Sequence, residues 1–196
     1  FEDQARRNWI ADLCGSQGLI ERAPLFLLFL ADLARSERVA AQAGGGAEAL
    51  DYMESLIVGF VDAAIAAQNA VIAAESLGLG TVYIGGLRNN LDRIHEGLQL
   101  PPFVAPAFGL CVGYADPERP ARVKPRLPIE AVLHRDAYRL AEQDAAIARY
   151  DETMKLFQRA EKMPDYGWTP TTANRVSNVK VLMGRARLRD FLHSFG

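Results

Sequence analysis

The sequence contains few of the residues that most often act as nucleophiles or bind metal ions, since only two of its 196 residues are cysteine and three are histidine. Cys14 and Cys111 lack the CxxC spacing of a zinc or redox site, and we expect both to be reduced because a chain of this size needs no disulfide. His95, His134 and His193 stand in unrelated contexts, and no GxSxG or HExxH motif occurs. The sequence therefore predicts no catalytic side chain and no metal site.

Neither sign of charge is in excess, because 22 Lys and Arg stand against 24 Asp and Glu and leave a formal net charge of −2. Nucleic-acid binders usually carry a strongly basic domain, so we expect no such partner. With 49% hydrophobic and 23% charged residues, the composition is typical of a compact soluble protein, and we predict a single domain over residues 1–196. The charged segment Phe1–Arg7 has no signal-peptide core, which predicts a cytoplasmic protein.

The longest segment without proline, Asp51–Leu77, predicts a long helix, and Gly78 follows it as a suitable C-cap. The only formal charge between residues 55 and 74 is Asp62, so the segment fits both a membrane span and a helix buried inside a soluble protein. A carboxylate at the centre of a bilayer is costly. We therefore expect no membrane partner and predict a central core helix that also faces a second subunit.

Shorter hydrophobic patterns follow one another along the rest of the chain. Leu25–Leu30 is a continuous apolar run, which predicts a strand buried on both sides. Further strands are predicted at Thr81–Ile84 and Pro106–Tyr114. Helices are predicted at Asp3–Leu13, Asn90–Leu98, Asp144–Lys162 and Ser177–Ser194, and a surface connection at Ala40–Ala49. Strands that alternate with helices indicate a mixed α/β or α+β fold.

The strand at Thr81–Ile84 leads into a double glycine, Gly85 and Gly86, just before a helix. Glycines at such a place let backbone N–H groups meet a flat or anionic ligand, because no Cβ intervenes. The same pair could simply turn the chain, and spacing alone does not decide between the two interpretations. The pattern is not GxGxxG, so a Rossmann site is not indicated.

Two cations, Lys124 and Arg126, lie two residues apart on a proline-rich segment that ends at Pro128. On an extended chain their side chains project to the same side and could grip a phosphate. From these residues alone, we favour the alternative of a solvated basic loop.

Taken together, these segments resemble the NADPH-dependent, oxygen-insensitive nitroreductase and flavin reductase family. The matching segments are collinear and cover most of the chain: Gly59–Asp62, Ala67–Ala70, Ile72–Gly80, Val82–Asn90, Phe108–Cys111, Gly113 and Lys124–Pro128. No single segment is specific, whereas the ordered set is. The resemblance implies an α+β fold with a central, mostly antiparallel sheet flanked by helices, and a homodimer with the long helix at its interface.

The resemblance also implies FMN as the cofactor, in a pocket built by both subunits. The positions that match the wall against the isoalloxazine ring are Tyr83, Ile84, Gly85, Gly86 and Leu87, while Gln17 matches a glutamine that touches the flavin. Lys124 and Arg126 match the residues that hold the FMN phosphate, and Arg88 and Asn89 match the entrance used by the nicotinamide nucleotide and the substrate. No catalytic side chain is needed, because the cofactor performs the chemistry.

The activity implied is hydride transfer from NADPH, by a ping-pong cycle, to nitroaromatics, quinones or free flavin. A second hypothesis is a flavin-binding or degenerate relative that acts as a carrier or sensor without turnover.

The sequence departs from the family pattern at two places. An Arg-Ser-x-Arg segment that completes the family's phosphate pocket, and the Ser-rich stretch that follows it, have no counterpart here. Either roughly fifty further residues precede Phe1 in the full protein, which is the alternative we favour, or the protein does not bind FMN normally. The family's Arg-rich loop, which meets the 2′-phosphate of NADPH, is shorter and less basic here. Arg159 and Lys162 are the candidates for that role, and the preference for NADPH over NADH stays open.

Overall fold

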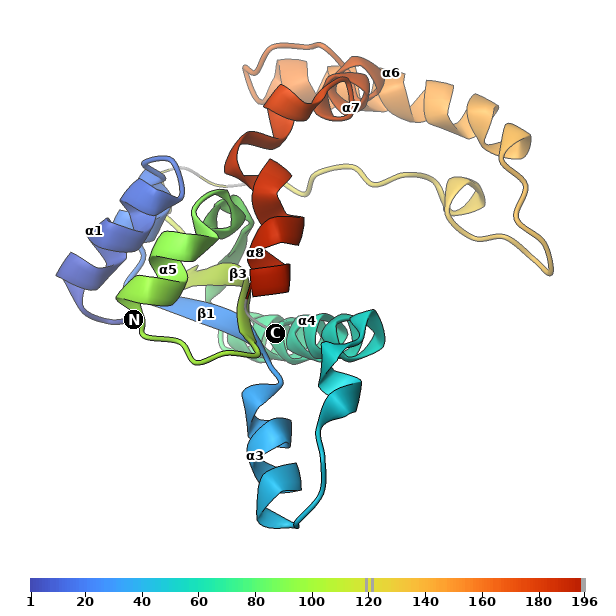
Figure 1. The fold of residues 1–196 in the computed structure, drawn as a ribbon. Coiled ribbons are helices and arrows are strands. Elements are labelled where there is room, and N and C mark those ends of the chain that lie inside the picture. Colours follow the sequence, from blue (N-terminus) through green and yellow to red (C-terminus); the bar gives the residue numbers. More distant parts are fainter. Residues whose placement is uncertain (119, 121, 195–196) are drawn as a thin grey trace. The chain divides into compact units, whose positions relative to one another are not determined.

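The computed structural model describes residues 1–118, 120 and 122–194, which fall into two compact units (Figure 1). The first unit is Phe1–Glu118 together with Met183–Gly196, and the second unit is Arg119–Leu182. The single domain over residues 1–196 stays a prediction, since one domain can contain more than one compact unit.

In the first unit, the described strands form one antiparallel sheet in the order β1, β3, β2. β1 (Leu25–Asp32) and β2 (Gly80–Ile84) both pair with β3 (Val104–Gly113), which is the central strand. The helical elements of this unit are α1 (Gln4–Leu13), α2 (Gly18–Arg22), α3 (Ala34–Gln42), η1 (Glu48–Asp51), α4 (Met53–Ser76), η2 (Gly86–Asn89), α5 (Leu91–Gly97) and α8 (Leu188–Ser194). The α+β class, the antiparallel sheet and the three predicted strands are confirmed.

Buried side chains lie on both faces of this sheet. On one face, Phe26 of β1 and Cys111 of β3 belong to a buried cluster with Ile10 of α1. On the other face, Leu110 of β3 packs in a cluster with Val71 of α4. Neighbouring residues of β3 thus point to opposite faces, as the pleat of a strand requires.

β1 is a strand as predicted, but it is less buried than predicted. Phe26 and Ala31 are buried, whereas the other residues of the strand are partly exposed. Within the described residues β1 pairs only with β3, so it is an edge strand of the sheet. An uninterrupted apolar run is typical of a strand covered on both sides, and here the position at the edge leaves part of the run accessible.

α4 confirms the predicted long helix, and a glycine ends it. Gly78 has a φ of +77°. Its N–H donates to the Glu75 carbonyl at 3.0 Å, and the N–H of Leu79 donates to the Ala74 carbonyl at 3.1 Å. These two bonds form a Schellman motif, which satisfies carbonyl groups at the end of a helix.

In α4 the small side chains are buried and the large aliphatic side chains are exposed. The buried residues face the rest of the first unit and are three small residues and one valine: Gly59, Ala63, Ala67 and Val71. Large aliphatic residues are exposed: Ile57, Val61, Ile65 and Ile72. The helix is long and apolar enough to cross a membrane, by length and composition, with 17% of its most apolar window buried in this structure. The prediction of a helix buried centrally is therefore wrong for the described chain by itself, because only the small-residue face meets the sheet.

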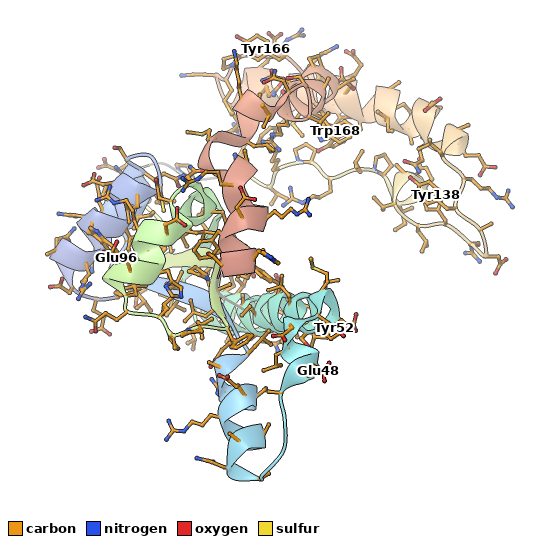
Figure 2. The ribbon with its side chains drawn as sticks, in the orientation of Figure 1. Glu48, Tyr52, Glu96, Tyr138, Tyr166 and Trp168 are labelled. Carbon is orange, nitrogen blue, oxygen red and sulfur yellow. The ribbon has the colours of Figure 1, made fainter. Side chains whose placement is uncertain are left out.

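The second unit contains η3 (Ile129–Ala131), η4 (Ala141–Gln143), α6 (Asp144–Ala160) and α7 (Thr169–Arg175), and α6 confirms the helix predicted there. Asp151 of α6 fixes the beginning of α7. Its Oδ1 accepts the N–H groups of Trp168 at 2.8 Å and Thr169 at 2.6 Å. Trp168, which Figure 2 labels, is the N-cap residue of α7. Tyr150, the residue before Asp151, meets the Trp168 ring edge-on, with 5.7 Å between ring centroids.

The structure confirms one further predicted helix, shortens a predicted connection and divides another predicted helix in two. The helix predicted at Asp3–Leu13 is confirmed as α1, with the Asp3 carboxylate accepting the Arg6 N–H at 2.8 Å. The connection predicted at Ala40–Ala49 begins later than predicted, because α3 continues to Gln42. The single helix predicted at Ser177–Ser194 is wrong: it consists of η5 (Val179–Arg187) and α8, and Met183 interrupts η5 with φ 53° and ψ −136°.

Candidate functional site

The double glycine lies where β2 ends and η2 begins. Ile84 is the last residue of β2, Gly85 caps η2 and Gly86 is its first residue. Neither glycine has a positive φ, so a left-handed turn does not explain the pair. Because η2 begins at Gly86, the first N–H groups of this turn have no acceptor within it and can donate to a ligand.

Gly86 is a glycine because the chain around α1 approaches it closely. A Cβ on Gly86 would lie 2.8 Å from the Cys14 carbonyl oxygen and 2.8 Å from Nε2 of Gln17. Gln17 itself donates from Nε2 to the same Cys14 carbonyl at 3.4 Å. The structure thus brings together Gln17 and Gly86, two residues far apart in the sequence that were both predicted to contact the flavin.

Gly85 has a different surrounding. A Cβ there would lie 3.2 Å from Nη2 of Arg88, the far end of a flexible side chain. The two glycines are therefore not equivalent, since Gly86 lies against the Cys14 carbonyl and the Gln17 amide, whereas Gly85 meets only the end of the Arg88 side chain.

The other residues predicted to contact the ring differ in burial: the side chains of Ile84 and Leu87 are buried, and that of Tyr83 is exposed. The side chains of Ile84 and Leu87 are 3% and 0% exposed and belong to the buried cluster beside α1, so only their backbone can meet a ligand. Tyr83 is 45% exposed. Its hydroxyl donates to Oε1 of Gln68 on α4 at 3.4 Å, and its ring meets Phe108 edge-on.

Two buried thiols lie next to this turn. Burial raises the pKa of Cys14 to about 12, and the neighbouring Cys111 adds to the shift. Burial also raises the pKa of Cys111 to about 11. Both cysteines are free in the structure, and their thiols are protonated at neutral pH, so they contribute packing rather than nucleophilic chemistry.

Arg88 is anchored by an irregularity in the sheet. The pairing of β1 with β3 shifts between Phe29 and Leu30, so that Ala107 is an extra residue on β3. The Ala107 carbonyl accepts a hydrogen bond from Nη1 of Arg88 at 2.8 Å. Partial burial lowers the pKa of Arg88, and the positive charge of Arg185 lowers it further. The bulge thus holds a cation at the end of η2.

Arg88 also lines an apolar cavity of about 420 Å³ in the first unit. The walls of this cavity come from α4, β3 and the C-terminal helix: Leu56, Ile57, Phe60, Val61, Ala107, Phe108, Leu188 and Leu192. An apolar cavity with a single charged group can accept a flat ring that carries a polar substituent.

Asn89 follows in the same turn and is tied to the C-terminal segment. Its Oδ1 is buried and has no hydrogen-bond partner in the described part of the chain. A Cβ on Gly184 would overlap the Asn89 carbonyl group, so the two main chains are in direct contact.

The rest of the C-terminal segment contacts α5. Arg187 forms an ion pair with Asp92, and Phe191 meets the His95 ring edge-on at 6.0 Å. The segment that begins at Gly184 therefore packs against η2 and α5.

The predicted phosphate ligands, Lys124 and Arg126, lie in the second unit and are exposed. Among the residues that the structure describes, neither forms an ion pair with a carboxylate. Arg126 donates from Nη1 to the Lys124 carbonyl at 3.2 Å. Two cations without acidic partners are suited to an anion with two or more charges.

The two residues predicted to contact the nucleotide, Arg159 and Lys162, have different surroundings. Nε of Arg159 forms an ion pair with Asp165 at 2.6 Å, and the Arg159 guanidinium holds the pKa of that carboxyl below its usual range. Lys162 has a φ of +56° just after α6. The carboxylate of Asp165 thus occupies one edge of the guanidinium that a 2′-phosphate would need.

The chemistry of these groups fits FMN in its parts. In the first unit, backbone N–H groups at η2 can donate to the heteroatoms of a ring. In the second unit, Lys124 and Arg126 can hold a phosphate. In the described ranges no group of three or more His, Cys, Asp or Glu residues could hold a metal ion.

Sequence reasoning missed several residues that position this site. Cys14 and Gly184 contact it only through the fold, and no local pattern marks them. Ala107 had a signal: Pro106, inside a strand, is typical of an edge or a bulge.

Comparisons with known proteins agree with one another. A family model described as "Nitroreductase family" matches residues 2–114, and one described as "Nitroreductase family, C-terminal domain" matches residues 124–196. The chain is 41% identical over 197 residues to "FMN reductase (NADPH)" of Bacillus subtilis (strain 168), covering 99% of the chain and 78% of that protein. It is 43% identical over 152 residues to "Oxygen-insensitive NADPH nitroreductase" of Salmonella typhimurium, covering 78% of the chain and 60% of that protein.

Among solved structures, Bacillus megaterium NfrA2 matches with a TM-score of 0.92 and 34% identity, over 100% of this chain and 78% of that one. The chain therefore spans between three fifths and four fifths of the length of these relatives.

Proposed function

Because this chain belongs to the nitroreductase family, we propose that it is an FMN-dependent oxidoreductase that transfers hydride from NADPH to nitroaromatics, quinones or free flavin. The observation that carries the proposal is the meeting of Gln17 with Gly86 at the beginning of η2. Relatives named as an NADPH-dependent FMN reductase and an NADPH nitroreductase support the activity.

The ring of FMN is held by the main chain of η2. With FMN bound, the N–H groups at the start of this turn would donate to the ring, and Gly85 carries no Cβ that would displace the Arg88 guanidinium beside it. Gln17 adds an amide that can donate or accept. Donors aimed at a ring that gains negative charge on reduction stabilise its reduced form.

The phosphate of FMN is held by Lys124 and Arg126. Each cation forms charge-assisted hydrogen bonds with phosphate oxygens, and neither must first leave a carboxylate in the described chain. Replacing both by Ala is expected to weaken FMN binding.

Arg88 and Asn89 line the entrance for the nicotinamide nucleotide and for the acceptor. The cation of Arg88, fixed on the Ala107 carbonyl, attracts anionic groups of NADPH and nitro or quinone oxygens. FMN, when bound, supplies the hydride chemistry itself, which is why no catalytic side chain is assigned.

The active form is a homodimer with α4 at its interface. Support comes from the exposed aliphatic residues of α4, which lie four and seven residues apart on one face: Ile57, Val61, Ile65 and Ile72. An apolar stripe of this kind on a helix is suited to burial against a second copy. The same proposal places the protein in the cytoplasm, with small-molecule substrates and no nucleic-acid or membrane partner.

The test is the colour of the purified full chain under anaerobic conditions. The protein is expected to bind FMN and be yellow, to bleach when NADPH is added, and to regain its colour when a nitroaromatic or a quinone follows. A protein that is colourless after incubation with excess FMN and removal of the unbound flavin by gel filtration contradicts the proposal. A yellow protein that NADPH does not bleach supports the second hypothesis, a flavin carrier or sensor.

A further inference from the structure

The segment that carries Lys124 and Arg126 is exposed, but its centre is tied to α6. The hydroxyl of Tyr150 donates to the Pro125 carbonyl at 3.0 Å. Tyr150 is 6% exposed, although the two cations on either side of its acceptor are exposed. A buried donor thus reaches the one residue that separates the two proposed phosphate ligands.

This hydrogen bond fixes the peptide unit between the two cations. Proline has no N–H and a restricted φ, so the carbonyl is the only main-chain hydrogen-bonding group of Pro125. The peptide bond is planar, and holding this carbonyl also sets the direction of the Arg126 N–H and Cα. Nη1 of the exposed Arg126 also donates to the Pro125 carbonyl at 3.5 Å and to the Lys124 carbonyl at 3.2 Å. The Tyr150 hydroxyl is the buried donor that holds the main chain from which both cations project.

The Tyr150 ring is itself held in place. Its edge contact with Trp168 has 5.7 Å between centroids, and the next residue along α6, Asp151, accepts the Trp168 N–H at 2.8 Å. Packing and capping in the second unit therefore determine where the hydroxyl lies. A donor on a fixed ring orders its acceptor at little further cost in entropy.

We propose that Tyr150 is a positioning residue for the phosphate of FMN, acting through the main chain of Lys124 and Arg126. This inference rests on the proposed function, because it needs those two cations to hold the phosphate. Preorganising the pair lowers the entropy that is lost when the phosphate binds, so Tyr150 favours the binding of FMN specifically over flavins without phosphate.

The experiment compares FMN with riboflavin, which has the same ring and no phosphate. The flavin-free full chain is titrated with each, and the dissociation constant is read from flavin fluorescence. Tyr150→Phe removes only the hydroxyl and is expected to weaken FMN binding about three- to tenfold, the usual worth of one hydrogen bond. Riboflavin binding is expected to stay unchanged. Tyr138→Phe, at a tyrosine of the same unit that is 70% exposed, is the matched control and is expected to change neither.

A second set of variants separates this inference from the function on which it rests. The double variant Lys124→Ala/Arg126→Ala is expected to weaken FMN binding, and adding Tyr150→Phe to it should have no further effect. If the double variant binds FMN normally, the phosphate assignment fails. If the double variant loses FMN affinity but Tyr150→Phe does not, the assignment stands and the positioning role is overturned. Equal losses for FMN and riboflavin, together with a lower unfolding temperature, show a purely structural role and also overturn it.

Discussion

The main chain of Gly86 packs directly on the carbonyl group of Cys14, so closely that a Cβ on Gly86 would lie 2.8 Å from that oxygen. This contact joins the end of β2 to the end of α1, and Gln17 lies within the same 2.8 Å of the absent Cβ. The glycine therefore has a packing reason that is independent of any ligand.

The two glycines are expected to respond differently to alanine. Gly86→Ala forces backbone apart and should lower the free energy of unfolding of the flavin-free chain by about 1–3 kcal/mol, as for other overpacked sites. Gly85→Ala meets only the end of Arg88, so the flavin-free chain should be nearly as stable as the parent, while FMN binding weakens. Denaturant unfolding and FMN titration measure the two effects. Equal unfolding free energies for the two variants contradict this distinction.

Gly184 is expected to control the turn that carries Arg88 and Asn89. Gly184→Ala pushes the Asn89 carbonyl away and should raise KM for NADPH severalfold, with a smaller effect on kcat. Gly46→Ala is the control, because a Cβ there meets nothing within 4 Å and its φ is not positive. Steady-state kinetics with varied NADPH tests the effect, and an unchanged KM in Gly184→Ala would show that the contact does not reach the site.

The apolar face of α4 is expected to hold the dimer together. Ile65 is 57% exposed in the chain by itself, so Ile65→Glu should leave the fold of one chain intact and prevent association. Light scattering after gel filtration measures the mass. Glu96→Gln, at an exposed position of α5, changes the charge on another helix and should remain dimeric. A dimeric Ile65→Glu protein would place the interface elsewhere.

Asp151 makes the second unit sensitive to acid. Its hydrogen bonds from Thr169, Lys155 and Trp168 lower the pKa of the carboxyl from 3.8 to about 2. A carboxyl with a lowered pKa stabilises the folded state above its unfolded-state pKa, and this contribution disappears as the pH falls through the folded-state value. The parent should therefore lose about 1 kcal/mol between those two pH values that Asp151→Asn does not lose, after allowance for solvent screening. Urea unfolding across this range tests it, and parallel curves for the two proteins would contradict the role of Asp151.

The buried thiols are expected to be inert. With pKa values of about 12 for Cys14 and about 11 for Cys111, only a very small fraction is thiolate at about pH 8, and thiolate is the reactive form. A thiol reagent should therefore label neither cysteine in the native protein and both in denaturant. Rapid labelling of the folded chain would show that this part of the first unit opens.

Local patterns predicted much of the fold. Two local patterns identified β1 and β3: the apolar run at Leu25–Leu30 and the alternation in Pro106–Tyr114. A strand can be recognised in this way because its hydrophobic pattern depends on neighbouring residues. The absence of proline and a final glycine identified α4. The order in which the strands pair depends on contacts distant in sequence, so the edge position of β1 was not predictable from its own residues.

The same reasoning explains which parts of the site were found. Gln17 and Gly86 were named through the resemblance to a family, and the fold brings them together. The anchoring of Arg88 on Ala107 needs a bulge that exists only in the paired sheet. The bond from Tyr150 to Pro125 joins residues 25 positions apart, and neither residue carries a local sign of it. Residues that position a site through contacts distant in sequence are thus the hardest to predict from the sequence.

α4 places its smallest side chains against its own sheet and leaves its largest for the outside. In the proposed homodimer, a second copy of the chain would remove much of the apolar surface of this helix from solvent. Folding and self-association would then share one free energy, and the melting temperature would rise with protein concentration. Dilution alone would weaken such an enzyme.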